Sequence, residues 1–190
     1  MVHFSYLFPM ETKFSSFISR HSRILLFFFI AAFVAFFSFL AVIRHDNFHS
    51  RRLDLGNMEQ TVWNIAHGNG FTLTDPMGSQ NISRLGVHAD FLLILISPLY
   101  RLWSDARTLI LLQVLIIGLG ALPVYWIAHD TLKSKPLALF FAGTYLLYPP
   151  LERMTLHDFH AVSLSMTFLL FAYWYMQKKR YWLFALFALL

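Results

Sequence analysis

Residues 24–43, ILLFFFIAAFVAFFSFLAVI, are the stretch that decides the fold. They are twenty consecutive residues without a charge, and a helix of that length crosses roughly 30 Å of hydrocarbon. Lys13, Arg20 and Arg23 precede the run, and Arg44 follows it. The apolar core of a signal peptide has only about 7–15 residues, so this run is too long for one. We predict a retained first transmembrane helix with its N-terminus in the cytoplasm.

The composition of the whole chain agrees with a membrane protein. Of its 190 residues, 57% are hydrophobic and 13% are charged, whereas a soluble domain has about 25% charged residues. The absence of cysteine excludes disulfides and thiolate metal sites. The net charge is +5, but the basic residues flank apolar runs. They are therefore interpreted as orientation signals or phosphate ligands, and no nucleic-acid partner is expected.

Further apolar runs follow the first one. Residues 108–128 are a second full-length span, whereas 137–151 is shorter and 161–177 ends at the basic cluster 178–180. The last run, 181–190, stops in mid-span, so we expect a chain that is truncated at its C-terminus. The predicted fold is an all-α, polytopic transmembrane helical bundle.

Residues 91–103, FLLILISPLYRLW, leave two topologies open. If this short segment enters the membrane and returns, the basic clusters at 133–135 and 178–180 fall on the cytoplasmic side, as the positive-inside rule favours. A kinked span is the alternative. The predicted organisation is a cytoplasmic segment (1–23), a first helix (24–43), an external loop (44–90) and further membrane helices (91–190).

The external loop at 44–90 concentrates the polar residues. It holds five of the eight glycines and nine of the twenty-five charged side chains. Within it, residues 54–68 (DLGNMEQTVWNIAHG) have apolar residues at helical spacing, with Asp54 placed as an N-cap and Gly68 as a stop. Such a helix could lie in the membrane interface. Turn signals follow between residues 69 and 78.

Two acidic residues of this loop are candidates for catalysis. Asp54 lies where the chain leaves the first helix, and a carboxylate there could act as a general base or as a metal ligand. The alternative is a structural N-cap. Glu59 is more than one helical turn further on, so a solvated position is the alternative for that residue.

The segment His157-Asp158-Phe159-His160 is the densest cluster of potential ligands. On a helix the two histidines would share a face, and two imidazoles with a carboxylate suit a divalent metal or proton transfer. A third ligand would have to come from elsewhere, with Asp54, His88 and Asp90 as candidates. The alternative is a set of interfacial polar residues between two helices.

Four arginines could bind a phosphate through bidentate hydrogen bonds: Arg51, Arg52, Arg84 and Arg153. Contact with lipid headgroups is the alternative.

The order of four motifs resembles one family. The motifs are LDLGNMEQTVWNIAHGNGF, LGVHADFLLILISPLYRLW, LLQVLIIGLGALPVYWIA and YLLYPPLERMTLHDFH, within residues 50–190. They resemble the predicted prokaryotic membrane proteins grouped as domain of unknown function 2079.

That family in turn is similar to the GT-C superfamily of integral-membrane glycosyltransferases. The resemblance implies a sugar donor linked to polyprenyl phosphate, used on the outer face of the plasma membrane. It also implies an acidic catalytic residue in the first external loop, which Asp54 matches. Many GT-C enzymes have two adjacent acids there, whereas Leu55 follows Asp54 in this chain. We expect the N-terminal part of a GT-C-like glycosyltransferase, with a divalent metal as its candidate cofactor. A transporter and a non-catalytic structural membrane protein are the alternatives.

Overall fold

A computed structural model describes residues 13–75 and 77–190, and it is mostly helical in that part of the chain. The helices are α1 (Lys13–Asp46), α2 (Asn57–Ala66), α3 (Leu92–Ile96), α4 (Arg107–Leu119), α5 (Ala121–Leu132), α6 (Lys135–Leu146), α7 (Pro149–Leu156), α8 (Ala161–Gln177) and α9 (Tyr181–Leu189). The expectation of an all-α fold is therefore confirmed, with one small addition. A two-stranded antiparallel hairpin, β1 (Thr72–Thr74) and β2 (Asn81–Ser83), lies in the loop after α1.

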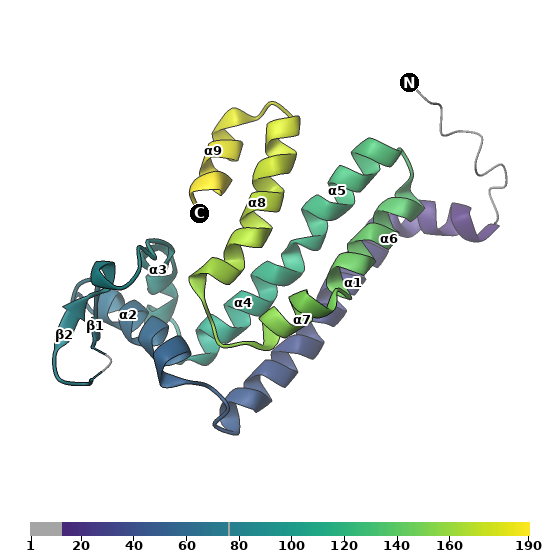
Figure 1. The fold of residues 1–190 in the computed structure, drawn as a ribbon. Helices are drawn as coiled ribbons and strands as arrows, with labels where there is room; N and C mark the ends of the chain where they lie inside the picture. Colours follow the sequence, from purple (N-terminus) through teal and green to yellow (C-terminus); the bar gives the residue numbers. More distant parts are fainter. Residues whose placement is uncertain (1–12, 76) are drawn as a thin grey trace.

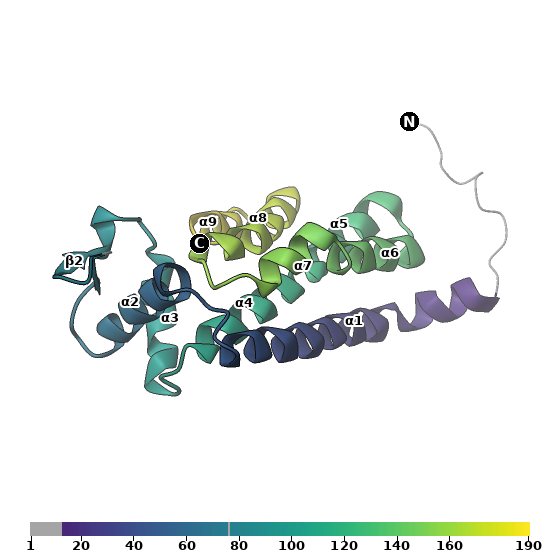
Figure 2. The ribbon, with the colours of Figure 1, turned by 60° about the horizontal axis from the view of Figure 1, so that its bottom comes forward.

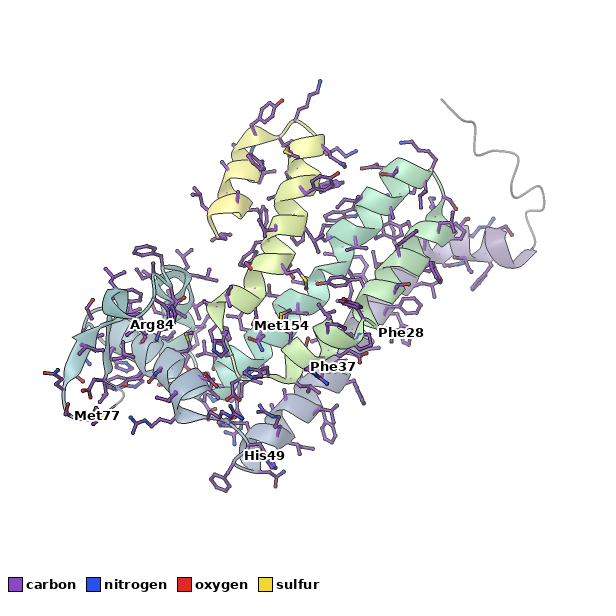
Figure 3. The ribbon with its side chains drawn as sticks, in the orientation of Figure 1. Phe28, Phe37, His49, Met77, Arg84 and Met154 are labelled. Atoms are coloured by element: carbon purple, nitrogen blue, oxygen red, sulfur yellow. The ribbon has the colours of Figure 1, made fainter. Side chains whose placement is uncertain are left out.

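Helix α1 is the long axis of the molecule, and α4 to α7 pack along it (Figures 1 and 2). One stripe of α1 is buried against α4 and α6, and its members recur every three or four residues: Leu26, Ile30, Phe33, Phe37 and Ala41. Other phenylalanines of α1 remain exposed, including Phe28, which is labelled in Figure 3. A helix that is apolar on both its packed and its exposed faces is suited to a lipid environment.

Two helices are long and apolar enough to cross a membrane, as judged from length and composition within the described residues. They are Ser16–Asp46 and the continuous run Arg107–Leu132, formed by α4 and α5. The predicted spans at 24–43 and 108–128 lie inside these helices. The segment Leu92–Arg101, formed by α3 and the 3-10 turn η4 (Ser97–Arg101), is shorter. A straight helix of ten residues covers about 15 Å, half the hydrocarbon thickness.

Glycines allow α4 and α5 to approach their neighbours closely. A Cβ atom on Gly118 would lie 2.9 Å from Val34 Cγ2 of α1. A Cβ atom on Gly120 would lie 2.7 Å from Tyr145 Cζ of α6 and 2.9 Å from Thr167 Oγ1 of α8. Small residues at helix contacts are the usual means of close packing in membrane bundles. A larger residue at either position would therefore increase the separation between these helices.

The loop between α1 and α4 folds into a cap at one end of the bundle, where α2, α3 and the hairpin lie together (Figure 1). Side chains of α2 hold the hairpin. Gln60 donates to Thr74 Oγ1 over 2.7 Å and accepts from Thr74 N over 3.0 Å, while Asn64 donates to Thr72 O over 2.9 Å. Asp75 accepts from the backbone and side chain of Ser79, and these hydrogen bonds hold the pKa of the Asp75 carboxyl below its ordinary value. The predicted turn signals after residue 69 therefore mark a hairpin.

Candidate functional site

The buried carboxylate of Asp158 joins the end of α1 to the segment between α7 and α8. Its side chain is 1% exposed. Oδ1 accepts from Arg44 Nη1 over 2.8 Å, and Oδ2 accepts from the backbone N–H of Arg51 over 2.7 Å. Arg44 also donates to the carbonyl oxygen of His49, so the chain turns tightly after α1. A buried charge needs a partner of opposite charge and further hydrogen bonds, and Asp158 has both.

The amide of Gln113 on α4 holds the other side of this segment. Gln113 is buried, and its Nε2 donates to the carbonyl oxygens of His157 (3.1 Å) and Met154 (3.3 Å). Its Oε1 accepts from the backbone N–H of His160 over 3.1 Å. Together, Asp158 and Gln113 fix a short non-helical segment whose backbone could not otherwise satisfy its polar groups.

His157 and His160 lie in this segment and not on a helix. Helix α7 ends at Leu156, and His160 is the extended residue before α8. The expectation that the two histidines share a helical face is therefore wrong, because hydrogen bonds to Gln113 replace those of a helical turn. Their rings nevertheless lie close, with centroids 5.6 Å apart.

Asp54 faces His160. Their Oδ1 and Nε2 atoms are 3.4 Å apart, and the two side chains are 27% and 31% exposed. Nδ1 of His160 lies 3.0 Å from the carbonyl oxygen of Asp158, which can only accept a hydrogen bond. In the neutral ring, Nδ1 therefore carries the hydrogen, and Nε2 turns its lone pair toward the carboxylate. Two acceptors side by side can receive the proton of a hydroxyl group that approaches the pair.

Asp54 does not cap a helix, so the N-cap interpretation is wrong. It lies inside the π-helical turn η2 (Arg52–Gly56), and the N-cap of α2 is Gly56. Backbone groups close this turn, with the N–H of Asn57 directed at the carbonyl oxygens of Arg52 and Asp54. The carboxylate of Asp54 is thus left for His160. Single-turn π segments occur frequently at functional sites.

Arg51 and Arg52 lie directly before Asp54, and both are exposed residues. Arg51 is fixed at its backbone by Asp158, and Arg52 lies beside the hairpin, with Nη1 4.0 Å from the position of a Cβ atom on Gly78. The backbone of Arg51 therefore lies at Asp158, and the guanidinium of Arg52 lies at the hairpin.

Arg84 is placed differently from the other arginines. It is 2% exposed, and its guanidinium forms an ion pair with Asp90 and donates to Met58 Sδ over 3.3 Å. Figure 3 shows it within the cap. This pairing directs its donors into the protein, and it occupies Asp90, which was a candidate third ligand. His88 is exposed in the same turn and donates its backbone N–H to Arg84 O.

Glu59 lies in the first turn of α2. Burial raises the pKa of the Glu59 carboxyl above its ordinary value of 4.5, the negative charge of Asp105 raises it further, and His45 opposes the shift. Within the described residues, no hydrogen bond or ion pair connects Glu59 to Asp54. The two acids predicted as catalytic therefore lie in different surroundings.

A metal site made by the protein alone does not fit the described residues. Among residues 13–75 and 77–190, no group of three or more His, Asp or Glu side chains is arranged to hold a metal ion. Asp158 is committed to Arg44 and Arg51, and Asp90 to Arg84.

Two residues of the site, Arg44 and Gln113, were not identified from the sequence. The sequence pattern indicates Arg44 only as a charge that flanks the first span. Gln113 is a polar residue within the apolar run at 108–128, and such a residue marks a function or a buried partner. The position of Gln113 within an apolar run is therefore the signal in the sequence that indicates this residue.

Comparison with known proteins agrees with the membrane character of the chain. One family matches residues 44–190, and it is described as "Predicted membrane protein (DUF2079)". No curated protein and no solved structure matches the chain. The match covers most of the chain, including the cap and every residue of the Asp54–His160 site. The chain belongs to the DUF2079 family of predicted membrane proteins.

Proposed function

We propose that this chain forms part of a multi-pass, GT-C-like glycosyltransferase that uses a polyprenyl-phosphate-linked sugar donor. The observation that carries the proposal is the pairing of Asp54 with His160 at 3.4 Å, in the loop that follows the first long helix, where the exposed residues Arg51 and Arg52 shortly precede Asp54 in the chain. The proposal is also supported by the resemblance to GT-C enzymes, which implies a catalytic acid in that loop. A location in the plasma membrane, with the N-terminus in the cytoplasm, belongs to the same proposal.

The chemistry assigns one role to each group. Asp54 accepts the proton of the acceptor hydroxyl and then shares it with Nε2 of His160, which lies 3.4 Å from the carboxylate oxygen. The acceptor oxygen forms a bond to the anomeric carbon of the sugar while the bond from that carbon to the phosphate oxygen breaks. The electron pair of the broken bond stays on the polyprenyl phosphate, which leaves. Arg51 and Arg52 stabilise the negative charge that grows on this leaving group.

The position of the site supports group transfer over transport. A transport pathway would place its ionisable residues near the middle of the bilayer. Asp158 instead pairs with Arg44, in the last turn of the candidate span Ser16–Asp46. His160 and Asp54 lie next to this pair, at the end of the helix where the cap packs (Figure 1). Substrates at the membrane surface could reach such a site.

The number of membrane passes belongs to the same proposal. Helix α8 has 17 residues, at the lower limit for a span, and α6 has 12. Both are apolar and continue the antiparallel order of the bundle (Figure 1). A multi-pass arrangement would place the segment at residues 157–160 on the same side as the loop after α1.

The test is transfer of a labelled sugar from a polyprenyl-phosphate donor by the full-length protein in membrane vesicles. His160→Gln is expected to lower the rate by about 10- to 100-fold, since the group that shares the proton contributes less than the base itself. His67→Gln is the matched control, because His67 is exposed on the far end of α2 and contacts Trp63 O. Equal rates for the wild type and His160→Gln would reject the pair as the catalytic centre.

A further inference from the structure

An apolar groove of about 990 Å³ runs along α1 and is closed on its other side by α6 and α7. On α1 its lining residues extend from Phe29 to Arg44, and Phe37, labelled in Figure 3, lies among them. The groove floor includes Gly143 and Leu146 of α6. None of these groups belongs to the Asp54–His160 pair, so the proposed transfer chemistry leaves the groove without a role.

The groove is polar at one end only. From Phe29 to Leu40 its α1 wall is apolar, and a helix rises about 17 Å over that interval. This length is close to the depth of one leaflet, which is half of roughly 30 Å. At the other end lie Arg44, Arg153 and Glu152. Along the groove, the lining residues therefore change from apolar to charged. This change occurs over a distance similar to that between the hydrocarbon chain of a lipid and its headgroup.

The charged end can bind an anion. Arg44 is 32% exposed on its side chain and uses Nη1 for Asp158 and Nη2 for His49 O, whereas a guanidinium carries five N–H donors. Arg153 is exposed, on the neighbouring face of α7. Two guanidinium groups at the head of an apolar groove are complementary to a phosphate attached to a hydrocarbon chain.

We propose that this groove binds a polyprenyl phosphate, with the chain between α1 and α6 and the phosphate against Arg44 and Arg153. The choice of this lipid rests on the proposed function. Asp158 connects the two sites, since it accepts from Arg44 and its carbonyl oxygen lies 3.0 Å from His160 Nδ1. Arg44 and the backbone N–H of Arg51 contact the same carboxylate of Asp158, so a phosphate at Arg44 would lie beside Arg51, which the proposed transfer assigns to the same phosphate.

The experiment uses the full-length protein in phosphatidylcholine nanodiscs and a polyprenyl monophosphate that carries a photoreactive diazirine on its chain. We expect crosslinks in α1 between residues 29 and 40 and in α6 near Gly143. Unlabelled polyprenyl monophosphate should compete. Uncharged polyprenol, inorganic phosphate and phosphatidylglycerol should compete at least tenfold more weakly. Equal competition by polyprenol or phosphatidylglycerol, or crosslinks confined to other helices, would overturn the proposal.

Two variants of neighbouring residues test the charged end, because their expected effects have opposite signs. Arg153→Gln should weaken labelling about fivefold to tenfold, the effect of one charge-assisted hydrogen bond at a partly exposed position. Glu152→Gln removes a negative charge from the same end and should strengthen labelling by about twofold. A folding defect would weaken labelling in both variants and so cannot produce opposite changes. Labelling that changes in the same direction in both variants would contradict the assignment of the phosphate to this end.

A second pair of variants tests the apolar part. Ala32 lines the groove and is exposed, so Ala32→Phe should fill the groove without disturbing the packed stripe of α1. Ala31→Phe is the matched control, since Ala31 is exposed and is not part of the lining. Labelling should fall at least fivefold only in Ala32→Phe. If labelling follows this pattern but the protein transfers no sugar, the groove is supported and the proposed function is rejected. If the protein transfers sugar and Ala32→Phe leaves that transfer intact, the proposed function is kept and the groove is rejected as the donor site.

Discussion

The substitution Asp158→Asn tests whether one buried carboxylate holds the site together. Asparagine has the shape of aspartate, but one of its two oxygens becomes an amide nitrogen that can only donate. In the protein, both oxygens accept from donors, Arg44 Nη1 at 2.8 Å and Arg51 N at 2.7 Å. Either orientation of the new amide therefore places a donor against a donor, and Arg44 loses its counter-charge.

The expected loss of stability follows from the exposure of the two partners. Removing one member of a fully buried ion pair costs about 3–5 kcal/mol. Arg44 is 32% exposed, so water can solvate its charge, and we take about 2 kcal/mol for the pair. The lost hydrogen bond from Arg51 adds about 1 kcal/mol. A total of ~3 kcal/mol lowers the Tm of a chain of this length by about 6–12 °C.

The assay is thermal unfolding of the purified protein in detergent, followed by tryptophan fluorescence. Asp130→Asn is the control, because Asp130 also pairs with a cation, Lys178 at 2.8 Å, but the two side chains are 32% and 41% exposed. A pair of that kind contributes less than about 1 kcal/mol, so its loss should lower the Tm by less than ~4 °C. A shift for Asp158→Asn no larger than that for Asp130→Asn would refute the reasoning.

Three further changes test the bundle, the segment before α8 and the cap. Gly120→Ala should destabilise the protein by about 1–3 kcal/mol in the same thermal assay, because the new methyl group would overlap the ring and hydroxyl of Tyr145; an unchanged Tm would contradict the close approach. Gln113→Leu should lower the stability by about 2–4 kcal/mol, since it removes three hydrogen bonds to the segment at 154–160. It should also slow sugar transfer. A wild-type Tm together with a wild-type transfer rate would refute the role of Gln113 in holding this segment. The pKa of the Glu59 carboxyl is raised in the folded state, so the stability that the protonated form contributes is present below the ordinary value of 4.5 and is lost as the pH rises through the folded value. Glu59→Gln, uncharged at every pH, should therefore have a higher Tm than the wild type near neutral pH and the same Tm near pH 4, and a lower Tm at neutral pH would contradict this sign.

The fold was largely predictable because long apolar runs leave few alternatives. The expected run at 161–177 coincides with α8, and those at 24–43 and 108–128 lie within longer helices. The hairpin was not predicted, because each strand has only three residues and is held by side chains of α2. Such pairing depends on contacts with residues elsewhere in the chain, and the hydrophobic periodicity of the sequence does not indicate these contacts.

The site was predictable in part. Asp54, His157 and His160 were identified from their residue types and positions, and the structure brings Asp54 to His160. The partner of Arg44 is 114 positions away in the chain, so no local pattern could indicate that this arginine fixes Asp158. Local sequence also could not indicate that Arg84 is buried and does not face a phosphate. Its burial depends on Met58 and on the fold of the turn before Asp90.

The most direct test of the central proposal is the rate of sugar transfer from a polyprenyl-phosphate donor by Asp54→Asn in the full-length protein. Asparagine keeps the shape of the residue and removes the base, so we predict a rate at least about 100-fold below that of the wild type. Asp46→Asn, which alters an exposed carboxylate paired with Arg107, should keep the wild-type rate. A folded Asp54→Asn protein that transfers sugar at the wild-type rate would contradict the assignment of Asp54 as the base.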